Sequence, residues 1–296
     1  MINELVQKAP QLHQVQRLCQ ILEVSRAWYY QRPRAQAHQK AKREKLASEI
    51  EGVLTSKAGR RYGYRRVTKA LGRAGRKVAA KVVLGVMRLK GWLCRRKRKP
   101  KGTTKSLAGT TGENLLSKLQ AGEGVQAPNQ VWAGDITLIE YGAKRDKRCY
   151  LATLLDVFSR RVVGWQLSRN CDTELVLGAL QKALDTRQVE AGLIHHSDRG
   201  SQYTSSDYRA ELGRVAAKIS LAGKGKPWEN GIAESFNGTL KMEEVWLQEY
   251  ESYEEVAQHL KEWLEQIYDK ERLHSSLGYV PPAEYEEAWL AGDIRA

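Results

Sequence analysis

The chain has 296 residues, of which 42% are hydrophobic and 28% are charged. This composition allows one large domain or two to three modest ones, and it excludes a disordered chain because enough apolar side chains are present to form a core. No stretch approaches the ~18–20 apolar residues of a membrane-spanning helix, and the four cysteines form no CxxC pair that would indicate zinc or a disulfide framework. Because no apolar leader is visible, we expect a cytoplasmic protein.

Charge is divided unevenly along the chain. Residues 1–128 contain 29 basic and 7 acidic residues, a net charge of +22, whereas residues 129–296 contain 20 basic and 27 acidic residues, a net charge of −7. No acidic residue lies between Glu51 and Glu113, a segment with 19 lysines and arginines. Such a surplus in one half of a chain is typical of nucleic-acid binding. The alternative is a solvated basic surface or a disordered tail, which the apolar periodicity of the same segment disfavours.

The first 40 residues predict a helix-turn-helix-like DNA-binding segment. Apolar residues from Val15 to Leu22 share one helix face. Ser25 is suited to cap a second, short helix over residues 26–30, which Pro33 is expected to end. In helix-turn-helix proteins the second helix enters the major groove.

Residues 41–100 predict a second basic helical module. A helix is expected around residues 46–54, followed by a basic turn and two helices that bury apolar stripes and expose basic faces. The stripes expected to be buried are Val67 with Leu71, and Val82 with Val86, Leu89 and Leu93. A basic run at residues 95–99 is typical of a flexible phosphate-binding arm, and the Gly- and Thr-rich residues 101–127 predict a linker.

Residues 128–290 predict an α/β core. β-branched and aromatic runs are separated first by turns and then by helical segments, which favours three antiparallel strands extended by strands that are joined through helices. Strands are expected at 131–141, 148–158, 160–168, 192–195 and 218–221, and helices at about 173–186, 204–215 and from 229. This order predicts a ribonuclease-H-like mixed sheet preceded by small all-α helix-turn-helix modules.

A last helix is expected from Ser252, where Glu255 completes a capping box. Its apolar face would consist of Val256, Leu260, Trp263 and Ile267. Residues 274–282 predict a turn-rich closing segment.

Three acidic residues stand where a carboxylate needs an explanation. Asp135 lies in the middle of a predicted strand, Asp198 follows the end of another, and Glu234 lies early in a predicted helix, with 35 residues between the last two. Clustered carboxylates repel one another, and hard cations such as Mg²⁺ resolve the repulsion; two such ions can hold both oxygens of a phosphoryl transfer. Taken singly, Asp198 could instead be a turn residue and Glu234 an acid favoured by the helix dipole.

Three blocks around these carboxylates resemble the signatures of retroviral-integrase-type DDE transposases. They are residues 132–137 (WAGDIT), 196–203 (HSDRGSQY) and 229–236 (ENGIAESF). The 35-residue spacing is similar to that family, as is a basic residue seven positions after Glu234, here Lys241. With RYGYRRV before the core and LGYVPP in the tail, the chain resembles more narrowly the OrfB proteins of the "IS three" family of bacterial insertion sequences.

The resemblance implies roles for individual residues. Asp135, Asp198 and Glu234 would be catalytic and would ligate two Mg²⁺ ions, for which Mn²⁺ could substitute. Lys241 would contact DNA phosphate near the cleaved bond. The other residues expected to contact DNA are Arg199, Arg61, Arg65, Arg66, Arg95, Arg96, Lys97 and Arg98. The residues expected to support the site are His196, Asn230, Gln202 and Tyr203.

Other polar residues near these blocks have two interpretations. Asp156 could orient the site, although a turn role is favoured, and His195 could serve the site or simply end a strand. Arg272 and His274 resemble a family motif for which tail packing is favoured over chemistry. The pair at residues 228–229 is Trp-Glu where many relatives have Tyr-Asp, a departure that leaves the three carboxylates intact.

The resemblance implies metal-dependent cleavage at the ends of an insertion sequence and attack of the freed 3′-OH on another phosphodiester, by way of a circular DNA. We therefore predict a mobile-element enzyme of DNA transposition, integration and recombination, associated with the bacterial nucleoid. Expected partners are double-stranded terminal repeats and target DNA, further copies of the chain, and an upstream-frame OrfA protein, separate or fused by frameshifting. The alternatives are a non-catalytic DNA-binding regulator and a ribonuclease-H-type or junction-resolving nuclease.

Overall fold

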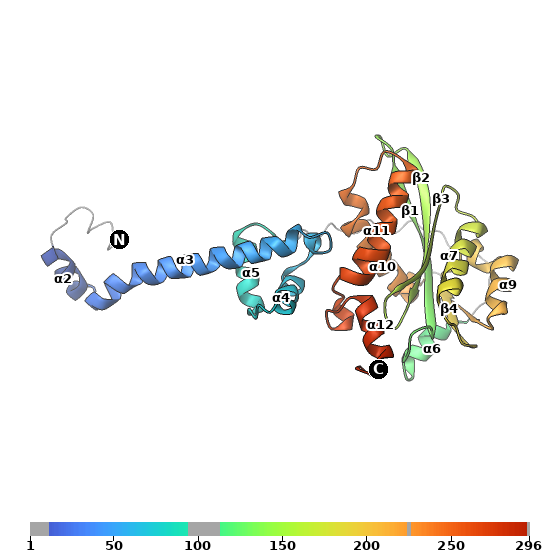
Figure 1. Ribbon diagram of the computed structural model, residues 1–296, viewed down its shortest axis with the longest axis horizontal. Coiled ribbons are helices and arrows are strands. Elements are labelled where there is room, and N and C mark those ends of the chain that lie inside the picture. Colours follow the sequence, from blue (N-terminus) through green and yellow to red (C-terminus); the bar gives the residue numbers. More distant parts are fainter. Residues whose placement is uncertain (1–11, 94–112, 224–225, 295–296) are drawn as a thin grey trace. The chain divides into compact units, whose positions relative to one another are not determined.

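The computed structural model describes residues 12–93, 113–223 and 226–294 (Figure 1). The chain divides into two compact units, Met1–Ser56 with Tyr62–Cys94 and Lys57–Arg61 with Arg95–Ala296. The described part of the first unit is helical, and the second unit is built on a β-sheet. Within the described ranges, no helix is both long and apolar enough to cross a membrane.

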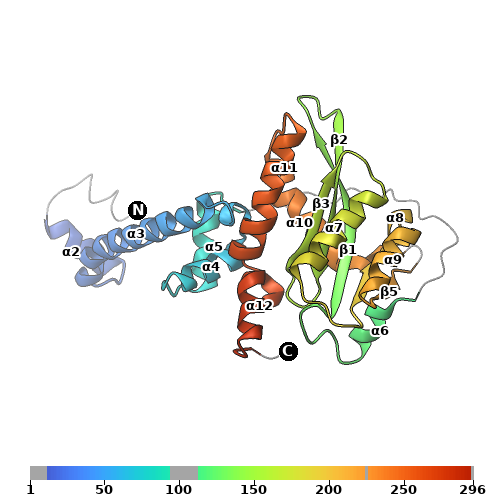
Figure 2. The ribbon, with the colours of Figure 1, turned by 45° about the vertical axis from the view of Figure 1, so that its right-hand side comes forward.

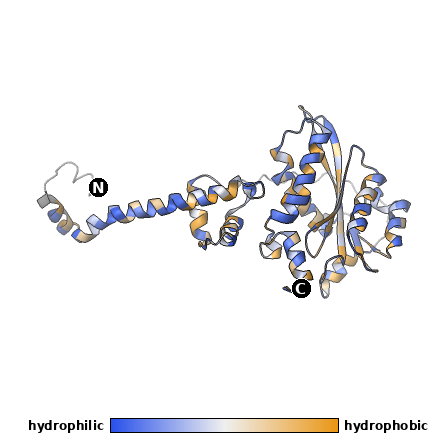
Figure 3. Ribbon diagram, viewed as in Figure 1, coloured by the Kyte–Doolittle hydropathy of each residue, from blue (hydrophilic) through white to orange (hydrophobic). Residues whose placement is uncertain are grey.

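The helical unit consists of α2 (Leu12–Ile21), α3 (Arg26–Thr55), α4 (Tyr64–Arg73) and α5 (Ala80–Leu89). The C-terminal part of α3 packs against both α4 and α5, which also pack on each other. The buried apolar residues of this small core are Leu46, Ala47, Ile50, Tyr62, Val67, Leu71, Val83, Val86 and Met87. Figure 3 shows that the earlier part of α3 is mostly hydrophilic, so α3 is held in the unit by its last turns.

The predicted end of a helix at Pro33 is wrong. Ser25 does cap the helix, since its Oγ accepts the Trp28 amide hydrogen at 3.0 Å. However, α3 continues without a break through Pro33 to Thr55, and the boundary expected at residues 40/41 falls inside this helix. Proline removes one backbone donor and costs ~3 kcal/mol in a helix interior. The strong helix formers that follow and the packing of the last turns outweigh that cost.

The predicted apolar stripe of α5 is confirmed only for Val86. Val82 is 49% exposed, Leu89 74% and Leu93 40%. Val86 is buried together with Val83 and Met87, and the spacing of these three residues, i, i+3 and i+4, also defines one helix face. Both faces of this helix are apolar, so periodicity did not distinguish the buried face from the exposed one.

The second unit contains a five-stranded sheet in the order β3-β2-β1-β4-β5. The strands are β1 (Val131–Tyr141), β2 (Lys147–Asp156), β3 (Val162–Ser168), β4 (Ile194–Ser197) and β5 (Lys218–Leu221). β1, β2 and β3 are antiparallel neighbours, whereas β1 with β4 and β4 with β5 are parallel pairs. The mixed sheet predicted from the order of elements is confirmed, and with it the ribonuclease-H-like fold class.

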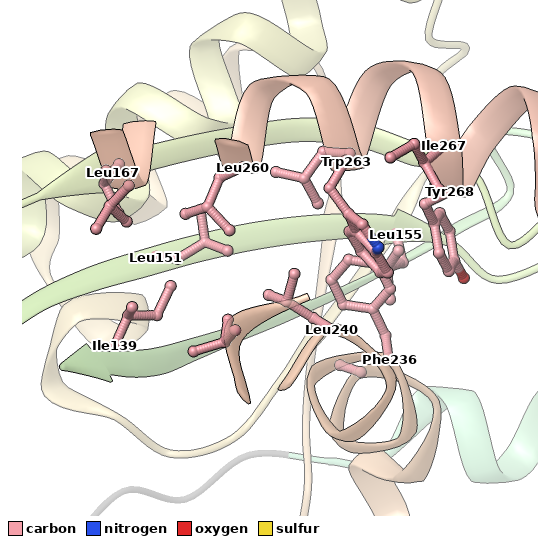
Figure 4. Close-up of a cluster of buried hydrophobic side chains, with 14 of the residues drawn as sticks. Ile139, Leu151, Leu155, Leu167, Phe236, Leu240, Leu260, Trp263, Ile267 and Tyr268 are labelled. Carbon is pink, nitrogen blue, oxygen red and sulfur yellow. The ribbon is translucent and has the colours of Figure 1, made fainter. Parts of the chain in front are cut away.

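Helices cover both faces of the sheet (Figures 1 and 2). One face packs against α7 (Thr173–Thr186), α8 (Ser201–Thr204) and α9 (Ser206–Arg214). The other packs against α6 (Leu115–Ala121), α10 (Gly231–Glu243), α11 (Tyr253–Glu262) and η4 (Trp263–Glu271). In Figure 4, Phe236 and Leu240 of α10 meet Leu151 and Leu155 of β2, together with side chains of α11 and η4. This cluster fixes α10 on the sheet.

Part of the predicted linker is structured. Residues 101–112 lie outside the described ranges, but residues 115–121 form α6, which Asn114 caps by accepting the Ser117 amide hydrogen at 2.8 Å. Leu116 of α6 is buried in the sheet core. The short apolar run at residues 115–119 was masked by the Gly- and Thr-rich composition that precedes it.

The C-terminal region contains more helix than expected. Ser252 caps α11 as predicted, although the Glu255 carboxylate accepts the amide hydrogen of Glu251 rather than that of Ser252. α11 continues as the π-helix η4, and the apolar face from Val256 to Ile267 is buried. Beyond the turn-rich segment, α12 (Pro282–Leu290) was not predicted.

Candidate active site

The sheet brings Asp135 and Asp198 to the same level. β1 pairs in parallel with β4, with Ala133 opposite His196. Asp135 and Asp198 each lie two residues beyond this pair, and neighbouring strands are ~4.8 Å apart. Residues two apart also point to the same face of a strand. The side chains of Asp135, in β1, and Asp198, just after β4, therefore extend from neighbouring strands on the same side of the sheet.

The third carboxylate comes from α10. Glu234 lies in the first turn of α10, whose apolar residues pack on the face of β1 that carries Ala133 and Ile139. Asp135 has the same parity along β1 as those two residues, so its side chain faces α10. Asp135 and Asp198 are partly buried, whereas Glu234 is exposed.

The electrostatics of Asp135 link all three carboxylates. The pKa of Asp135 is raised to about 7, mainly by burial and in addition by the negative charges of Asp198 and Glu234. Two hydrogen bonds oppose this shift: Asn237 Nδ2 donates to Oδ2 and the Ile136 amide donates to Oδ1, each at 2.9 Å. A carboxyl group with this pKa loses its proton near neutral pH. A bound cation would reduce the repulsion among the neighbouring carboxylates.

The site fits a divalent cation in its donor chemistry. Oxygen donors are what Mg²⁺ prefers, and three buried polar atoms on residues around Asp135 have no hydrogen-bond partner: Asn230 Oδ1, Asn237 Oδ1 and Tyr203 Oη. In the described parts of the chain, however, no three His, Cys, Asp or Glu side chains converge closely enough to hold a metal ion. The two-ion centre therefore stays a prediction.

His196 connects the elements that carry the site. The Ser220 hydroxyl accepts the amide hydrogens of Leu115 and Leu116, so its own hydrogen is available to His196 Nδ1 at 2.8 Å. His196 Nε2 then donates to the Glu229 carbonyl oxygen at 3.2 Å. Burial lowers the pKa of His196, which keeps the imidazole neutral. This fully buried side chain ties β4 to the residues that lead into α10.

The side chains of Asn230 and Gln202 each donate a hydrogen bond to a backbone carbonyl oxygen and so hold neighbouring segments together. Asn230 Nδ2 donates to the Gly134 carbonyl oxygen at 3.1 Å, which ties the start of α10 to β1 beside Asp135. Asn230 stands at the N-cap position of α10, but its side chain makes no capping hydrogen bond. Gln202 Nε2 donates to the Cys171 carbonyl oxygen at 3.0 Å, which holds α8 against the segment before α7.

Tyr203 lies beneath the two aspartates. A Cβ added to Gly134 would be only 3.3 Å from Tyr203 Cε1, and a Cβ added to Gly200 would be 3.6 Å from Tyr203 Cδ2. These two glycines adjoin the two aspartates: Gly134 precedes Asp135, and the Gly200 amide donates to Asp198 Oδ1 at 2.9 Å. The small residues therefore allow Tyr203 to pack directly under the backbone that carries the site.

The predicted DNA-contacting residues fall in different places. Lys241 is half-buried on α10 close enough to Asp135 and Glu140 for their charges to raise its pKa, although burial has the larger effect and lowers it. Arg199 lies beside Asp198 and its Nε donates to the Ala222 carbonyl oxygen at 2.8 Å. Arg65 and Arg66 lie on α4, stacked on Tyr64 and Tyr62 respectively, and Arg61 ends the short helix η1 (Gly59–Arg61). Residues 95–98 lie outside the described ranges.

The residues with two interpretations have structural contacts. Asp156 accepts amide hydrogens from Ser159 at 2.8 Å and Asn129 at 2.6 Å, which supports the turn role. His195 is buried against Tyr208, its Nε2 2.8 Å from the Tyr208 hydroxyl, and burial lowers its pKa to about 3. Arg272 forms a buried bidentate ion pair with Glu243 at 2.6 and 2.9 Å, which supports packing of the tail.

Asn237 is the site residue that sequence reasoning missed. It lies three residues after Glu234 and four before Lys241, so all three share one face of α10. That spacing was visible in the sequence, but only the structure joins Asn237 to Asp135.

Family comparisons agree with this architecture. Two models described as "Integrase core domain" match residues 125–227 and 216–282, and a model described as "HTH-like domain" matches residues 41–100. Among solved structures, the HTLV-2 integrase catalytic core domain in complex with magnesium (trimeric form) is 17% identical with a TM-score of 0.41, over 54% of this chain and 97% of that one. The family models alone assign an integrase core domain and a helix-turn-helix-like region to the chain.

Curated relatives define the family. The chain is 36% identical over 255 residues to the transposase for insertion sequence element IS904 of Lactococcus lactis, covering 86% of this chain and 98% of that protein. It is 33% identical over 282 residues to transposase InsF for insertion sequence IS3A of Escherichia coli, covering 94% and 95% respectively. The protein belongs to the transposases of IS3-family insertion sequences, as the sequence motifs predicted.

Proposed function

We propose that the protein cuts DNA at the ends of its insertion sequence and joins the freed 3′-OH to a second phosphodiester, with Asp135, Asp198 and Glu234 as the catalytic residues. The observation that best supports this is the raised pKa of Asp135, about 7, to which burial and the negative charges of Asp198 and Glu234 contribute. Two of the groups that raise this pKa are the other two carboxylates of the proposed triad, and the two donors that oppose the shift, Asn237 and the Ile136 amide, are neutral.

The three carboxylates would hold Mg²⁺ or Mn²⁺, in our proposal two ions, which would activate the attacking oxygen and neutralise charge on the phosphate. Asp135 would release its proton to solvent as it becomes a ligand, because a ligating carboxylate must be charged. Asn237 and the Ile136 amide would keep its two oxygens oriented, since each already donates to one of them. Lys241 would contact a DNA phosphate beside the site.

Each step exchanges one P–O bond for another without a covalent bond to the protein. In the first step water attacks the phosphodiester at the element's end and leaves a free 3′-OH. In the second step that 3′-OH attacks another phosphodiester. Positioning of the DNA then contributes most of the catalysis, so the basic helical unit, which binds phosphates, is an integral part of the reaction. Assembly of several copies on the DNA and an upstream-frame partner belong to the same proposal.

The test is Glu234→Gln in the full-length protein. We expect metal-dependent cleavage of element-end DNA to be lost while binding of the same DNA, measured by gel shift, is unchanged. Glu174→Gln is the matched control, because Glu174 is likewise an exposed acid in the first turn of a helix, α7. Unchanged cleavage by Glu234→Gln would refute the catalytic assignment, and equal loss in both variants would indicate an unspecific effect of charge.

A further inference from the structure

The sheet unit contains a cavity of about 300 Å³ that none of the three candidate catalytic carboxylates lines. It lies between α6, the turn from β2 to β3, the short helix η5 (Ser275–Leu277) and α12. All of these elements belong to the same compact unit. Part of its wall is apolar, formed by the buried side chains of Val157, Phe158 and Leu277. The volume is at the lower end of the range in which proteins bind small molecules.

The cavity contains a cation that lacks a partner. Arg160 is the one charged residue among the described residues that line it, which we therefore call the Arg160 cavity. Arg160 Nε is buried without a hydrogen-bond partner, and the side chain forms no ion pair with any described residue. Burial lowers the pKa of the guanidinium. Because a buried cation without a counter-ion is costly, an anion bound in the cavity would be stabilised by Arg160.

The acidic residues of this region are engaged by other groups. Asp156 accepts two backbone amide hydrogens at 2.6 and 2.8 Å. Asp269 and Glu286 both pair with Arg161, the residue after Arg160, at 3.6 and 3.1 Å. The local carboxylates therefore balance Arg161, and the charge of Arg160 is left for a ligand.

The remaining polar groups of the lining indicate which anion fits. Tyr285 and Ser276 contribute hydroxyl groups, and Gln120 and Gln126 contribute side-chain amides. A guanidinium is suited to phosphate, and an amide both donates and accepts hydrogen bonds, as the edge of a nucleobase does. The half-buried Tyr285 ring offers a surface on which a base can stack. A bare anion would use the cation and leave the amides and the apolar wall without a role.

We propose that the Arg160 cavity binds a single nucleotide, with its phosphate on Arg160 and its base against the apolar and aromatic wall. One cation suits one phosphate rather than the repeated phosphates of a duplex backbone. Two sources supply this chemistry: a free mononucleotide, and an unpaired nucleotide at the end of a DNA strand. The second source rests on DNA binding under the proposed function, whereas the first does not.

The first experiment is calorimetric titration of the full-length protein with deoxyadenosine monophosphate (dAMP), without divalent cations or DNA. Arg160→Gln should weaken binding at least ~tenfold, because a charge-assisted contact to the phosphate is lost. Arg145→Gln is the matched control and should leave dAMP binding unchanged. Arg145 is likewise an arginine in a turn between strands, with φ of 54° against 63° for Arg160, but it is exposed and does not line the cavity.

Arg160→Gly separates ligand binding from stability. Glycine adopts a positive φ without strain, and the substitution removes a cation that has no partner. The melting temperature should therefore be equal or higher while dAMP binding is lost. A lower melting temperature with unchanged dAMP affinity would mean that Arg160 stabilises the fold, and it would overturn the proposal.

The second experiment distinguishes the two sources by comparing a blunt duplex with one that carries an unpaired 5′ nucleotide. If the nucleotide belongs to DNA, the wild-type protein prefers the second duplex and Arg160→Gln removes that preference without weakening binding of the blunt one. If it is free, only dAMP binding responds to the substitution. Equal effects of Arg160→Gln and Arg145→Gln on both ligands would overturn the proposal, as would binding of inorganic phosphate or acetate as tight as that of dAMP. Failure of DNA cleavage under the proposed function would leave the dAMP result standing, so the two failures are distinguishable.

Discussion

The two units of the protein place their functional charges in opposite ways. In the helical unit, cations lie on the outward faces of α4 and α5, and helical periodicity alone puts them there. In the sheet unit, the three predicted carboxylates come from β1, the residue after β4 and α10, and only the packing of those elements lets the charges of Asp198 and Glu234 act on Asp135. Binding a long polyanion needs many similar exposed charges, whereas a reaction centre needs a few charged groups that lie close together and repel one another. We therefore predict that single substitutions strongly change the stability or the activity of the sheet unit, and that single substitutions in the helical unit have small effects.

The largest expected effect on stability is in the sheet unit. Arg272→Met leaves Glu243 as a buried carboxylate without its bidentate partner, because Arg272 is only 3% exposed. Breaking a buried ion pair from one side costs about 3–5 kcal/mol. The free energy of unfolding should fall by that amount in urea denaturation. Arg214→Met is the control, since Arg214 pairs with Glu211 on the surface and should cost about 1 kcal/mol or less.

A smaller effect is expected from removing the hydrogen bond to Asp135. Asn237→Ala should reduce cleavage by about 10–100-fold, the usual cost of losing a partner that orients a metal ligand. Because the pKa of Asp135 is raised to about 7, the charged form that binds cations increases as the pH rises through this value. The hydrogen bond from Asn237 lowers this pKa, so its loss moves the midpoint of Mn²⁺ binding to higher pH.

Calorimetric titration of Mn²⁺ at several pH values, without DNA, measures that midpoint. Thr239→Ala on the same helix is the control, because its hydroxyl only bonds to the Ser235 carbonyl oxygen, and it should leave the midpoint unmoved. A lower midpoint in Asn237→Ala would contradict the assigned sign of the contact.

The smallest effect is expected in the helical unit. Arg65→Ala on α4 should remove about one phosphate contact, which lowers the slope of log affinity against log salt by about 1 and weakens binding to all sequences alike. Affinities measured by fluorescence anisotropy at several salt concentrations provide the slope. A sequence-selective loss of affinity would mean that Arg65 contacts base edges rather than phosphate, and a loss of affinity greater than about 100-fold would break the contrast between the units.

Local patterns predicted the elements whose signals are contained in their own residues. The bounds of β1, α7 and β5 match the expected ranges 131–141, 173–186 and 218–221. Ser25 and Ser252 cap helices as predicted, because a cap depends on residues three positions away. The family membership was likewise predicted from motifs, since each motif lies within a few consecutive residues, whereas the catalytic role of the three carboxylates stays a prediction.

The misses share one cause, which is dependence on contacts far along the chain. Pro33 was expected to end a helix that packing and helix formers carry on to Thr55. α6 was hidden in an expected linker because its stability comes from burial of Leu116 against the sheet. The wrong face of α5 was expected to be buried because both of its faces are apolar.

By itself, the sequence determined the fold class, the family, and the division into a basic and an acidic half, and it proposed the three carboxylates as candidates. These follow from periodicity, composition and short motifs, which require no knowledge of distant neighbours. Only the tertiary structure decided that Asp135 has a pKa near 7, that Asn237 holds it, and that Val82 and Leu89 face outward. Each of these depends on which surfaces pack together, because burial and hydrogen bonding arise between residues that are distant in the sequence and close together in the fold.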